Sequence, residues 1–208
     1  MIAIIDYGVG NLFSLKSSLE SIGAQAVVTK DPEVLKQADH LILPGVGAFG
    51  DAMEKLRSSG MQEPLLAEAA NGKPIMGICL GMQMLFEVSY EYGTHKGLGL
   101  LPGSVVPLKG MIDESLQIPH IGWNGLHFQK KTSPLFADVQ ENDCVYFVHS
   151  YHAVDCSDSL VCTVEYGIEV TAAVEKGNIF GCQFHPEKSG AVGLRILKAF
   201  SNLEVPSC

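Results

Sequence analysis

The sequence predicts an α/β fold in which a mostly parallel central sheet is flanked by helices, with an added antiparallel element in the second half. Two observations carry this prediction. Up to Gly97, short apolar runs alternate with helix-like segments, which is typical of a doubly wound parallel sheet. After Gly97, short strand-like runs are separated by glycine, asparagine and aspartate turns. We expect residues 1–208 to form a single domain, because this length fits one medium-sized core.

Four strands and four helices are expected in the first half of the chain. The strands are apolar runs that end at glycine, proline or polar residues. Asn11 and Gly23 are suited to begin and end the first helix, which carries leucines at helical spacing. Expected strands are Ile2–Asp6, Ala26–Thr29, 41–47 and 74–81, and expected helices are 11–23, 50–60, 62–72 and 82–89.

The second half is expected to form an antiparallel element and one closing helix. Gly177 and Asn178 lie between two strand-like runs and favour a hairpin turn. Strand-like runs occupy 105–110, 118–128, 143–152, 159–167 and 170–184, and the helix occupies 191–203.

Composition excludes several classes of function. The net charge is −9 and no basic run is present, which disfavours nucleic-acid binding because phosphate contacts need clustered cations. No apolar segment is long enough to span a membrane, and the first residues lack the pattern of a signal peptide. The six cysteines show neither a CxxC pair nor metal-ligand spacing with histidine. We therefore expect a cytoplasmic protein with reduced thiols and no metal or other cofactor.

Cys79 is the candidate nucleophile. It is the central residue of G-x-C-x-G, between Gly77 and Gly81, where an apolar strand meets a helix. Such an elbow holds its central residue in a strained conformation, and the helix N-terminus favours the thiolate. The backbone N–H of Leu80 could donate to an oxyanion. The alternative is that Cys79 is a small buried side chain, which we assign to Cys144, Cys156, Cys162 and Cys182.

His185 and Glu187 form the candidate base and its orienting acid. Pro186 disfavours a helical conformation at His185, and in an extended chain the side chains of residues 185 and 187 point to the same side. A base held by an acid supplies two thirds of a nucleophilic triad. His149 also ends a strand-like run, but no acid follows it at the same spacing. His120 has no second residue at metal-ligand spacing.

The glycine-rich stretch Gly45–Val46–Gly47 is a candidate oxyanion loop. Its glycines permit positive φ and close backbone approach, so the N–H groups of Val46 and Gly47 could face an anion. The stretch lacks the G-K-[ST] ending of a phosphate-binding P-loop and the glycine spacing of a dinucleotide site. The alternative is an ordinary tight turn between a strand and a helix.

Together, "GICLGMQ", "PGVGAFG" and "FHPEKS" resemble the class I (triad) glutamine amidotransferases. "DYGVGN" and "PHIGWN" narrow the resemblance, which covers nearly the whole chain, to the glutaminase subunits of imidazole glycerol phosphate synthase. The resemblance implies an enzyme in which a Cys79–His185–Glu187 triad hydrolyses L-glutamine through a γ-glutamyl thioester. Implied glutamine-binding residues are Gly47, Gln83, Ser150 and Tyr151, and His149 falls in the same binding strand.

The resemblance also implies a partner, a (βα)8-barrel cyclase that receives ammonia through a channel. The implied interface residues, from the stretches that face the partner in that family, are Asn11, Pro119, Trp123, Asn124, Tyr146 and Lys188. For Trp123 the alternative is a core residue. Lys188 is expected to alternate away from His185 and Glu187, toward the partner.

Two other functions remain open from the sequence. The chain could serve a different synthase, such as an anthranilate, guanylate or pyridoxal-phosphate synthase, although "PHIGWN" and "DYGVGN" disfavour this. It could also be a non-catalytic scaffold that regulates a partner. The intact set of Cys79, His185 and Glu187 disfavours a scaffold.

Overall fold

The computed structural model describes residues 1–129 and 133–204 of the chain. Its central sheet has eight strands in the order β2-β1-β3-β4-β14-β13-β12-β9. The first five of these run parallel, and the last three continue the sheet antiparallel. In this order the strands are Ala26–Thr29, Ile2–Ile5, His40–Gly45, Ile75–Cys79, Ile179–Cys182, Glu169–Lys176, Leu160–Glu165 and His127–Phe128. The predicted fold class is confirmed.

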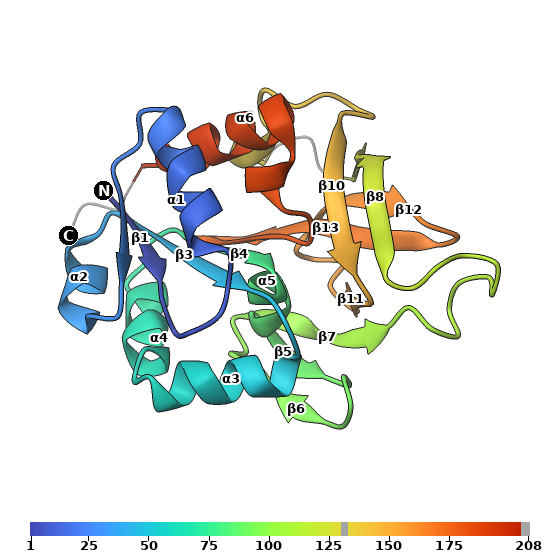
Figure 1. Ribbon diagram of the computed structural model, residues 1–208, viewed down its shortest axis with the longest axis horizontal. Coiled ribbons are helices and arrows are strands. Elements are labelled where there is room, and N and C mark those ends of the chain that lie inside the picture. Colours follow the sequence, from blue (N-terminus) through green and yellow to red (C-terminus); the bar gives the residue numbers. More distant parts are fainter. Residues whose placement is uncertain (130–132, 205–208) are drawn as a thin grey trace.

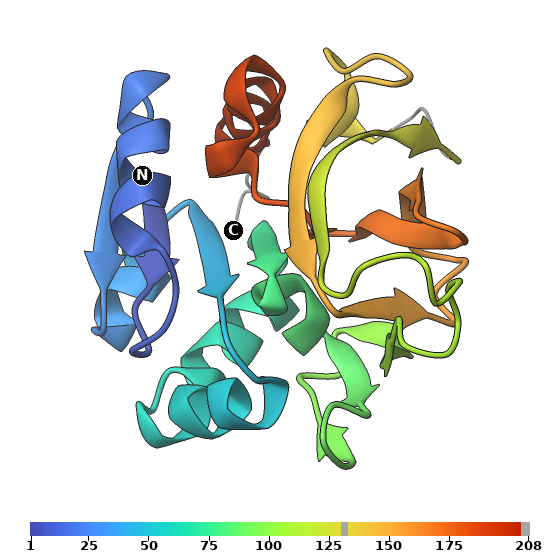
Figure 2. The ribbon, with the colours of Figure 1, turned by 45° about the vertical axis from the view of Figure 1, so that its right-hand side comes forward.

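Helices cover both faces of the central sheet (Figures 1 and 2). Side chains alternate along β1, so Ile2 and Ile4 pack in the core with α1 and α6, whereas Ala3 and Ile5 pack in the core of the opposite face. This explains why the strands have no polar side, since both of their faces are buried. The helices are α1 (Leu12–Ser21) and α6 (Gly190–Ser201) on one face, and α2 (Pro32–Gln37), α3 (Phe49–Ser58), α4 (Gln62–Ala70) and α5 (Leu80–Met84) on the other.

The expected helix over 82–89 is wrong beyond Met84. After α5 the chain turns into β5 (Phe86–Ser89), which pairs parallel with β7 (Leu101–Pro107) and antiparallel with β6 (His95–Lys96). The residues from Met82 to Phe86 are all buried, so this segment has no polar stripe that would mark a surface helix. Pairing with strands distant in the sequence decides the conformation of the segment.

Helix α2 was not predicted, although its start carries a local signal. Asp31 caps the helix by accepting a hydrogen bond from the Glu33 backbone N–H at 2.9 Å, and Pro32 occupies the first turn. At the first helix, Asn11 occupies the N-cap position but makes no side-chain capping hydrogen bond.

The second half adds strands outside the central sheet. β11 (Tyr151–Val154) extends the β7-β5-β6 sheet, and β8 (His120–Gly125) pairs with β10 (Cys144–His149) in a two-stranded ribbon. The ribbon stands at one end of the molecule, beside β12 and β13 (Figure 1). The hairpin predicted at Gly177 and Asn178 joins β13 to β14 and is confirmed.

Four of the cysteines are predicted to be small buried side chains, and the structure confirms this for three of them. Cys156, Cys162 and Cys182 are buried free thiols, and burial raises their pKa values. The assignment is wrong for Cys144, which is exposed because β10 turns its next residue, Val145, into the core instead. Cys208 lies outside the described residues.

Across residues 1–129 and 133–204, no helix has both the length and the apolar character needed to cross a membrane.

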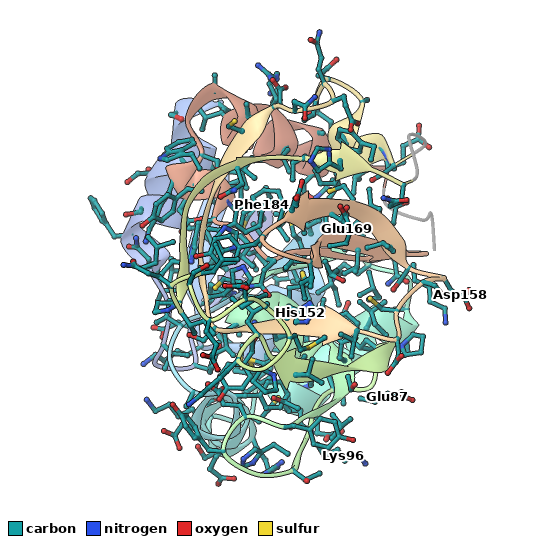
Figure 3. The ribbon with its side chains drawn as sticks, turned by 90° about the vertical axis from the view of Figure 1, so that its right-hand side faces the viewer. Glu87, Lys96, His152, Asp158, Glu169 and Phe184 are labelled. Carbon is teal, nitrogen blue, oxygen red and sulfur yellow. The ribbon has the colours of Figure 1, made fainter. Side chains whose placement is uncertain are left out.

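His152, on β11, lies in the interior of the molecule (Figure 3) with 2% of its surface exposed. Neither ring nitrogen has a hydrogen-bond partner among the described residues. Burial lowers the pKa of His152 to about 4. The folded chain therefore holds this side chain as an unsatisfied neutral imidazole, which costs free energy of folding.

His152→Leu is expected to raise the free energy of unfolding by about 1–2 kcal/mol, because it removes two unsatisfied buried polar atoms. The pKa of His152 is depressed on folding, so protonation favours the unfolded wild-type chain as pH falls below about 6.5. The gain should therefore be larger at pH 5.5 than at pH 7.5. Urea unfolding at both pH values measures it. His127→Leu, at an exposed histidine, is the control and should give no such gain. A destabilised His152→Leu variant at pH 7.5 would contradict the prediction.

Candidate active site

Cys79 lies at the junction of β4 and α5 with φ 54° and ψ −114°, the strained conformation predicted from its flanking glycines. Both glycines are required by contacts across the turn. A Cβ atom at Gly81 would lie 1.9 Å from the Leu43 carbonyl oxygen, and one at Gly77 would lie 2.6 Å from the Gly81 carbonyl oxygen. The turn can therefore close only without side chains at these positions.

His185 Nδ1 lies 2.8 Å from Glu187 Oε1, and both side chains are buried. His185 has the predicted extended conformation, but Pro186–Lys188 forms a 3-10 turn. The two side chains thus meet across a turn, and the expectation that they share one side of an extended strand is wrong in its geometry. The same turn invalidates the expectation that Lys188 alternates away from them as in a strand.

Cys79 and His185 line the same cavity, and the interaction with Cys79 contributes to the pKa of the His185 ring. Because Nδ1 faces Glu187, the nitrogen left for Cys79 is Nε2. Burial by itself lowers the pKa of His185, but the hydrogen bonds and charges of Cys79 and Glu187 outweigh burial and raise this pKa to about 9. The structure therefore brings the three predicted residues together in one buried cluster that favours a protonated imidazole.

Ser189 fixes the backbone of this cluster and was not predicted. Its hydroxyl donates to the His185 carbonyl oxygen at 2.6 Å and accepts from the Tyr146 N–H at 3.0 Å. The His185 N–H donates to the Tyr146 carbonyl oxygen at 3.0 Å. These bonds tie the turn that carries His185 to β10. A serine after a short motif gives no sequence signal for this role, because its partner is 43 residues away.

Two buried amide side chains lie behind Cys79. Gln183 Nε2 is 3.8 Å from Cys79 Sγ, and Gln183 Oε1 accepts from Gln83 Nε2 at 2.9 Å. Gln83 Nε2 also donates to the Tyr151 carbonyl oxygen at 3.1 Å. Gln83 is one of the predicted glutamine-binding residues, whereas Gln183 was not predicted. The signal in the sequence is an amide side chain within the otherwise apolar end of the strand predicted over 170–184.

A cavity of about 800 Å³ opens at the Cys79 elbow. β3 and β4 run side by side there, with Gly45 paired to Cys79, and a Cβ atom at Gly45 would lie 2.7 Å from the Gly81 nitrogen. Gly47, two residues after Gly45, has a positive φ of 96°. The predicted oxyanion and glutamine-binding residues all line the cavity, namely Val46, Gly47, Leu80, Gln83, His149, Ser150 and Tyr151.

Glu91 lines the same cavity and was not predicted; it lies two residues beyond the helix expected over 82–89. Its Oε2 accepts a hydrogen bond of 2.5 Å from the Phe49 N–H at the start of α3. Burial raises the pKa of Glu91, against the opposing effect of that hydrogen bond. A carboxylate in this position can receive a cationic group of a ligand.

The predicted interface residues gather around the β8-β10 ribbon, apart from Asn11 at the start of α1. Trp123 is 55% exposed, so the alternative of a core residue is wrong. Its ring lies 5.9 Å from the Tyr146 ring, centroid to centroid, and the Lys188 ammonium lies 5.9 Å from that same Tyr146 centroid. Pro119 and Lys188 also line the cavity, which joins this surface to the Cys79 elbow.

Asn124 faces inward from β8, toward a pair of buried histidines. His120 Nδ1 and His149 Nε2 are 3.0 Å apart, and His149 Nδ1 lies 2.9 Å from the Tyr151 carbonyl oxygen. Both nitrogens of His149 are thus engaged within the protein, so its ring has no free nitrogen for a ligand. Within the described ranges no group of three or more histidine, cysteine, aspartate or glutamate side chains could hold a metal ion.

A family model described as glutamine amidotransferase class-I matches residues 3–202. The chain belongs to the class I glutamine amidotransferases. Among its relatives in this family, a protein of Sulfurimonas denitrificans is 52% identical over 204 residues, which cover 97% of each chain. A protein of Bacillus velezensis is 50% identical over 206 residues, 98% of this chain and 96% of the relative. Both are named imidazole glycerol phosphate synthase subunit HisH. The predicted resemblance is confirmed.

Solved amidotransferase structures share the fold. One described as a glutamine amidotransferase superposes with a TM-score of 0.75 at 17% identity, covering 98% of this chain and all of the other. The PurLQS structure from Thermotoga maritima superposes with a TM-score of 0.72 at 23% identity, covering 97% of each chain. At these identities the likeness concerns the fold alone.

Proposed function

We propose that this chain is the glutaminase subunit of an imidazole glycerol phosphate synthase. It hydrolyses L-glutamine and delivers the ammonia through a channel to a (βα)8-barrel cyclase subunit, which makes imidazole glycerol phosphate and AICAR in histidine biosynthesis. One observation carries the proposal. The Cys79–His185–Glu187 cluster lies at a strained elbow in a chain that is about half identical, over nearly its full length, to relatives named as HisH subunits.

In the first step, the Cys79 thiolate attacks the side-chain amide carbon of glutamine. The carbonyl electrons move to the oxygen, where the N–H of Leu80 and an N–H of the Val46–Gly47 loop stabilise the negative charge. The His185 imidazolium gives its proton from Nε2 to the amide nitrogen. The carbon–nitrogen bond breaks, ammonia leaves, and a γ-glutamyl thioester remains on Cys79. The raised pKa of His185 supports the protonated starting state at neutral pH.

In the second step, water attacks the thioester carbonyl carbon. His185, now neutral, takes a proton from the water, and the sulfur leaves as thiolate. Glutamate is released and the imidazolium is restored, so the cycle balances. Glu187 holds the imidazole through Nδ1, which keeps Nε2 directed at the reacting atoms and stabilises the cation.

We expect the amino-acid end of glutamine to bind in the cavity beside Tyr151. Glu91 is suited to the α-ammonium group, because it presents a carboxylate at the cavity wall. The backbone of Gly47, Ser150 and Tyr151 borders the same space and can hydrogen-bond to the substrate. The Gln83 amide nitrogen is already bonded to Tyr151 and Gln183, which leaves its oxygen as the atom available to the substrate.

We expect the barrel partner to bind the surface formed by Trp123, Tyr146 and Lys188. An exposed tryptophan beside a cation–π pair is a typical anchor of a protein interface. This surface adjoins the cavity through Pro119 and Lys188. Ammonia released at Cys79 would thus leave beside the partner. Enclosed transfer matters, because ammonia in neutral water is mostly protonated and no longer nucleophilic.

Glutamine hydrolysis by the isolated chain is expected to be slow, and the barrel subunit with its nucleotide ligand should raise the turnover. The loop of Val46 and Gly47 is exposed at its tip, so one oxyanion donor can be misdirected until the partner binds. Loss of one such donor lowers kcat by about 10²-fold or more. We therefore expect the partner and its ligand to raise the turnover of glutamine hydrolysis by a similar factor. Glutamate release with and without the partner and its ligand measures it.

A free chain as fast as the stimulated complex would contradict the loop explanation. The absence of glutamine hydrolysis in the complex would contradict the proposed function itself. Stimulation by the synthase subunit for anthranilate or guanylate, and not by the barrel cyclase, would assign the chain to that enzyme.

A further inference from the structure

A continuous series of hydrogen bonds links the partner-facing ribbon to the nucleophile. It begins at Asn124 on β8 and passes through the rings of His120 and His149 to the Tyr151 carbonyl oxygen, with distances of 2.9, 3.0 and 2.9 Å. From that carbonyl it continues through Gln83 and Gln183 to Cys79 Sγ, with distances of 3.1, 2.9 and 3.8 Å. His120, His149, Gln83 and Gln183 are all buried.

The positions of the protons on the two histidines follow from one fixed acceptor, the Tyr151 carbonyl oxygen. The Tyr151 carbonyl oxygen can only accept, so His149 carries a proton on Nδ1 and, if neutral, a lone pair on Nε2. That lone pair lies 3.0 Å from His120 Nδ1, which must therefore carry a proton. Neutral His120 then has a lone pair on Nε2, directed at the side-chain amide of Asn124.

Two arrangements of protons satisfy the contact between His120 Nε2 and the Asn124 side chain. Either His120 takes a second proton and donates to the Asn124 amide oxygen, or the amide turns its nitrogen toward His120 and donates to it. The two ends of an asparagine amide have the same shape, so both fit the same space. The surroundings decide between them. His120 is fully buried and stacked between Phe147 and Tyr166, at ring centroid distances of 5.0 and 3.9 Å.

Burial in this apolar stack lowers the pKa of His120, and burial lowers that of His149 to about 3. Among residues 1–129 and 133–204, the hydrogen-bond and ring partners of the two histidines are Asn124, Tyr151 and aromatic rings, so none of these partners is a carboxylate that would offset a charge shared by the two rings. The neutral arrangement is therefore favoured, with the amide nitrogen of Asn124 as the first donor.

We propose that Asn124, His120, His149, Gln83 and Gln183 form one neutral hydrogen-bonded chain that positions the Tyr151 carbonyl and the Cys79 sulfur, with both histidines protonated on Nδ1. The proton assignment stands on the geometry, whereas its consequence for glutamine hydrolysis rests on the proposed function. In this arrangement Gln183 presents an amide N–H to the sulfur, which stabilises a thiolate. His120 and Gln183 are positioning residues, since neither lines the cavity.

The proton assignment is tested by two-bond 1H–15N NMR correlation of the full-length chain at pH 7, which distinguishes the two neutral tautomers and the imidazolium. We expect neutral rings protonated on Nδ1 at both His120 and His149. An Nε2-protonated tautomer at either residue, or an imidazolium at either residue, would overturn the proposal. Because this readout needs no enzyme activity, it remains decisive if the proposed function is wrong.

Asn124→Asp gives a sharper version of the same test. A carboxylate can only accept at neutral pH, while His149 still requires a proton on His120 Nδ1. His120 is therefore expected to become an imidazolium at pH 7 in this variant. Ile121→Ala is the matched control, since this neighbouring side chain on β8 is exposed and should leave both tautomers unchanged. A neutral His120 in Asn124→Asp would contradict the proposal.

The consequence for the nucleophile is tested by a pair of substitutions at His120. The amide nitrogen of His120→Asn can occupy the place of Nδ1 and donate to His149, whereas His120→Gln places its amide near Nε2 and loses that donor. We expect kcat for glutamine hydrolysis, and the rate of Cys79 alkylation by iodoacetamide, to be about 10-fold lower in His120→Gln than in His120→Asn, the effect of about one hydrogen bond. Equal rates in the two variants would show that the chain does not position Cys79.

Discussion

Cys79→Ala is expected to abolish glutamine-dependent synthesis in the reconstituted complex and to leave synthesis from added ammonium salt intact. Alanine removes the only atom of this side chain that can form the γ-glutamyl thioester, so no alternative route to ammonia remains in the chain. The barrel subunit would still accept ammonia from solution. Formation of imidazole glycerol phosphate with either nitrogen source measures the effect.

The local fold should tolerate this substitution, because alanine fits the space of a buried cysteine and keeps both flanking glycines. Cys144→Ala is the matched control, since this free cysteine is exposed and does not line the cavity. It should leave both activities unchanged. Glutamine-driven synthesis that survived Cys79→Ala would mean that another residue is the nucleophile.

The elbow could be predicted from the sequence because its determinants are adjacent in the chain. Gly77, Cys79 and Gly81 lie within one strand–helix junction, and their contacts involve mainly that turn and the neighbouring strand β3. Likewise, Pro186 restricts His185 locally. Sequence reasoning therefore found the three central residues, even though it assigned the wrong backbone geometry to the segment between His185 and Glu187.

The residues that surround the cluster could not be predicted in the same way. Gln183, which follows β14, contacts Cys79 across 104 residues of sequence, and Ser189 contacts Tyr146 across 43 residues. β5 is a strand because β7 and β6 pair with it, against the helix expected from its own sequence. Such contacts depend on the packing of distant elements, which no local pattern encodes.

Glu187→Gln is expected to lower kcat for glutamine hydrolysis by about 10²- to 10⁴-fold, as loss of the orienting acid does in a nucleophilic triad. The amide can present a donor to Nδ1 and stabilise the wrong tautomer of His185. It also removes a charge that raises the pKa of His185, so the imidazole should titrate below its wild-type value of about 9. Steady-state kinetics and NMR titration of His185 measure the two effects.

The His185–Glu187 pair contributes to the free energy of unfolding, and this contribution depends on pH. Because the pKa of His185 is raised on folding, from 6.5 to about 9, this contribution is fully present below pH 6.5 and is lost as pH rises through about 9. The whole shift corresponds to at most about 3 kcal/mol, part of which belongs to Cys79. The loss of unfolding free energy in Glu187→Gln should therefore be smaller at pH 9.5 than at pH 6. Glu165→Gln, at an exposed glutamate, is the control. If the titration of His185 were the same with and without the Glu187 carboxylate, the carboxylate would not be what holds the imidazolium at neutral pH.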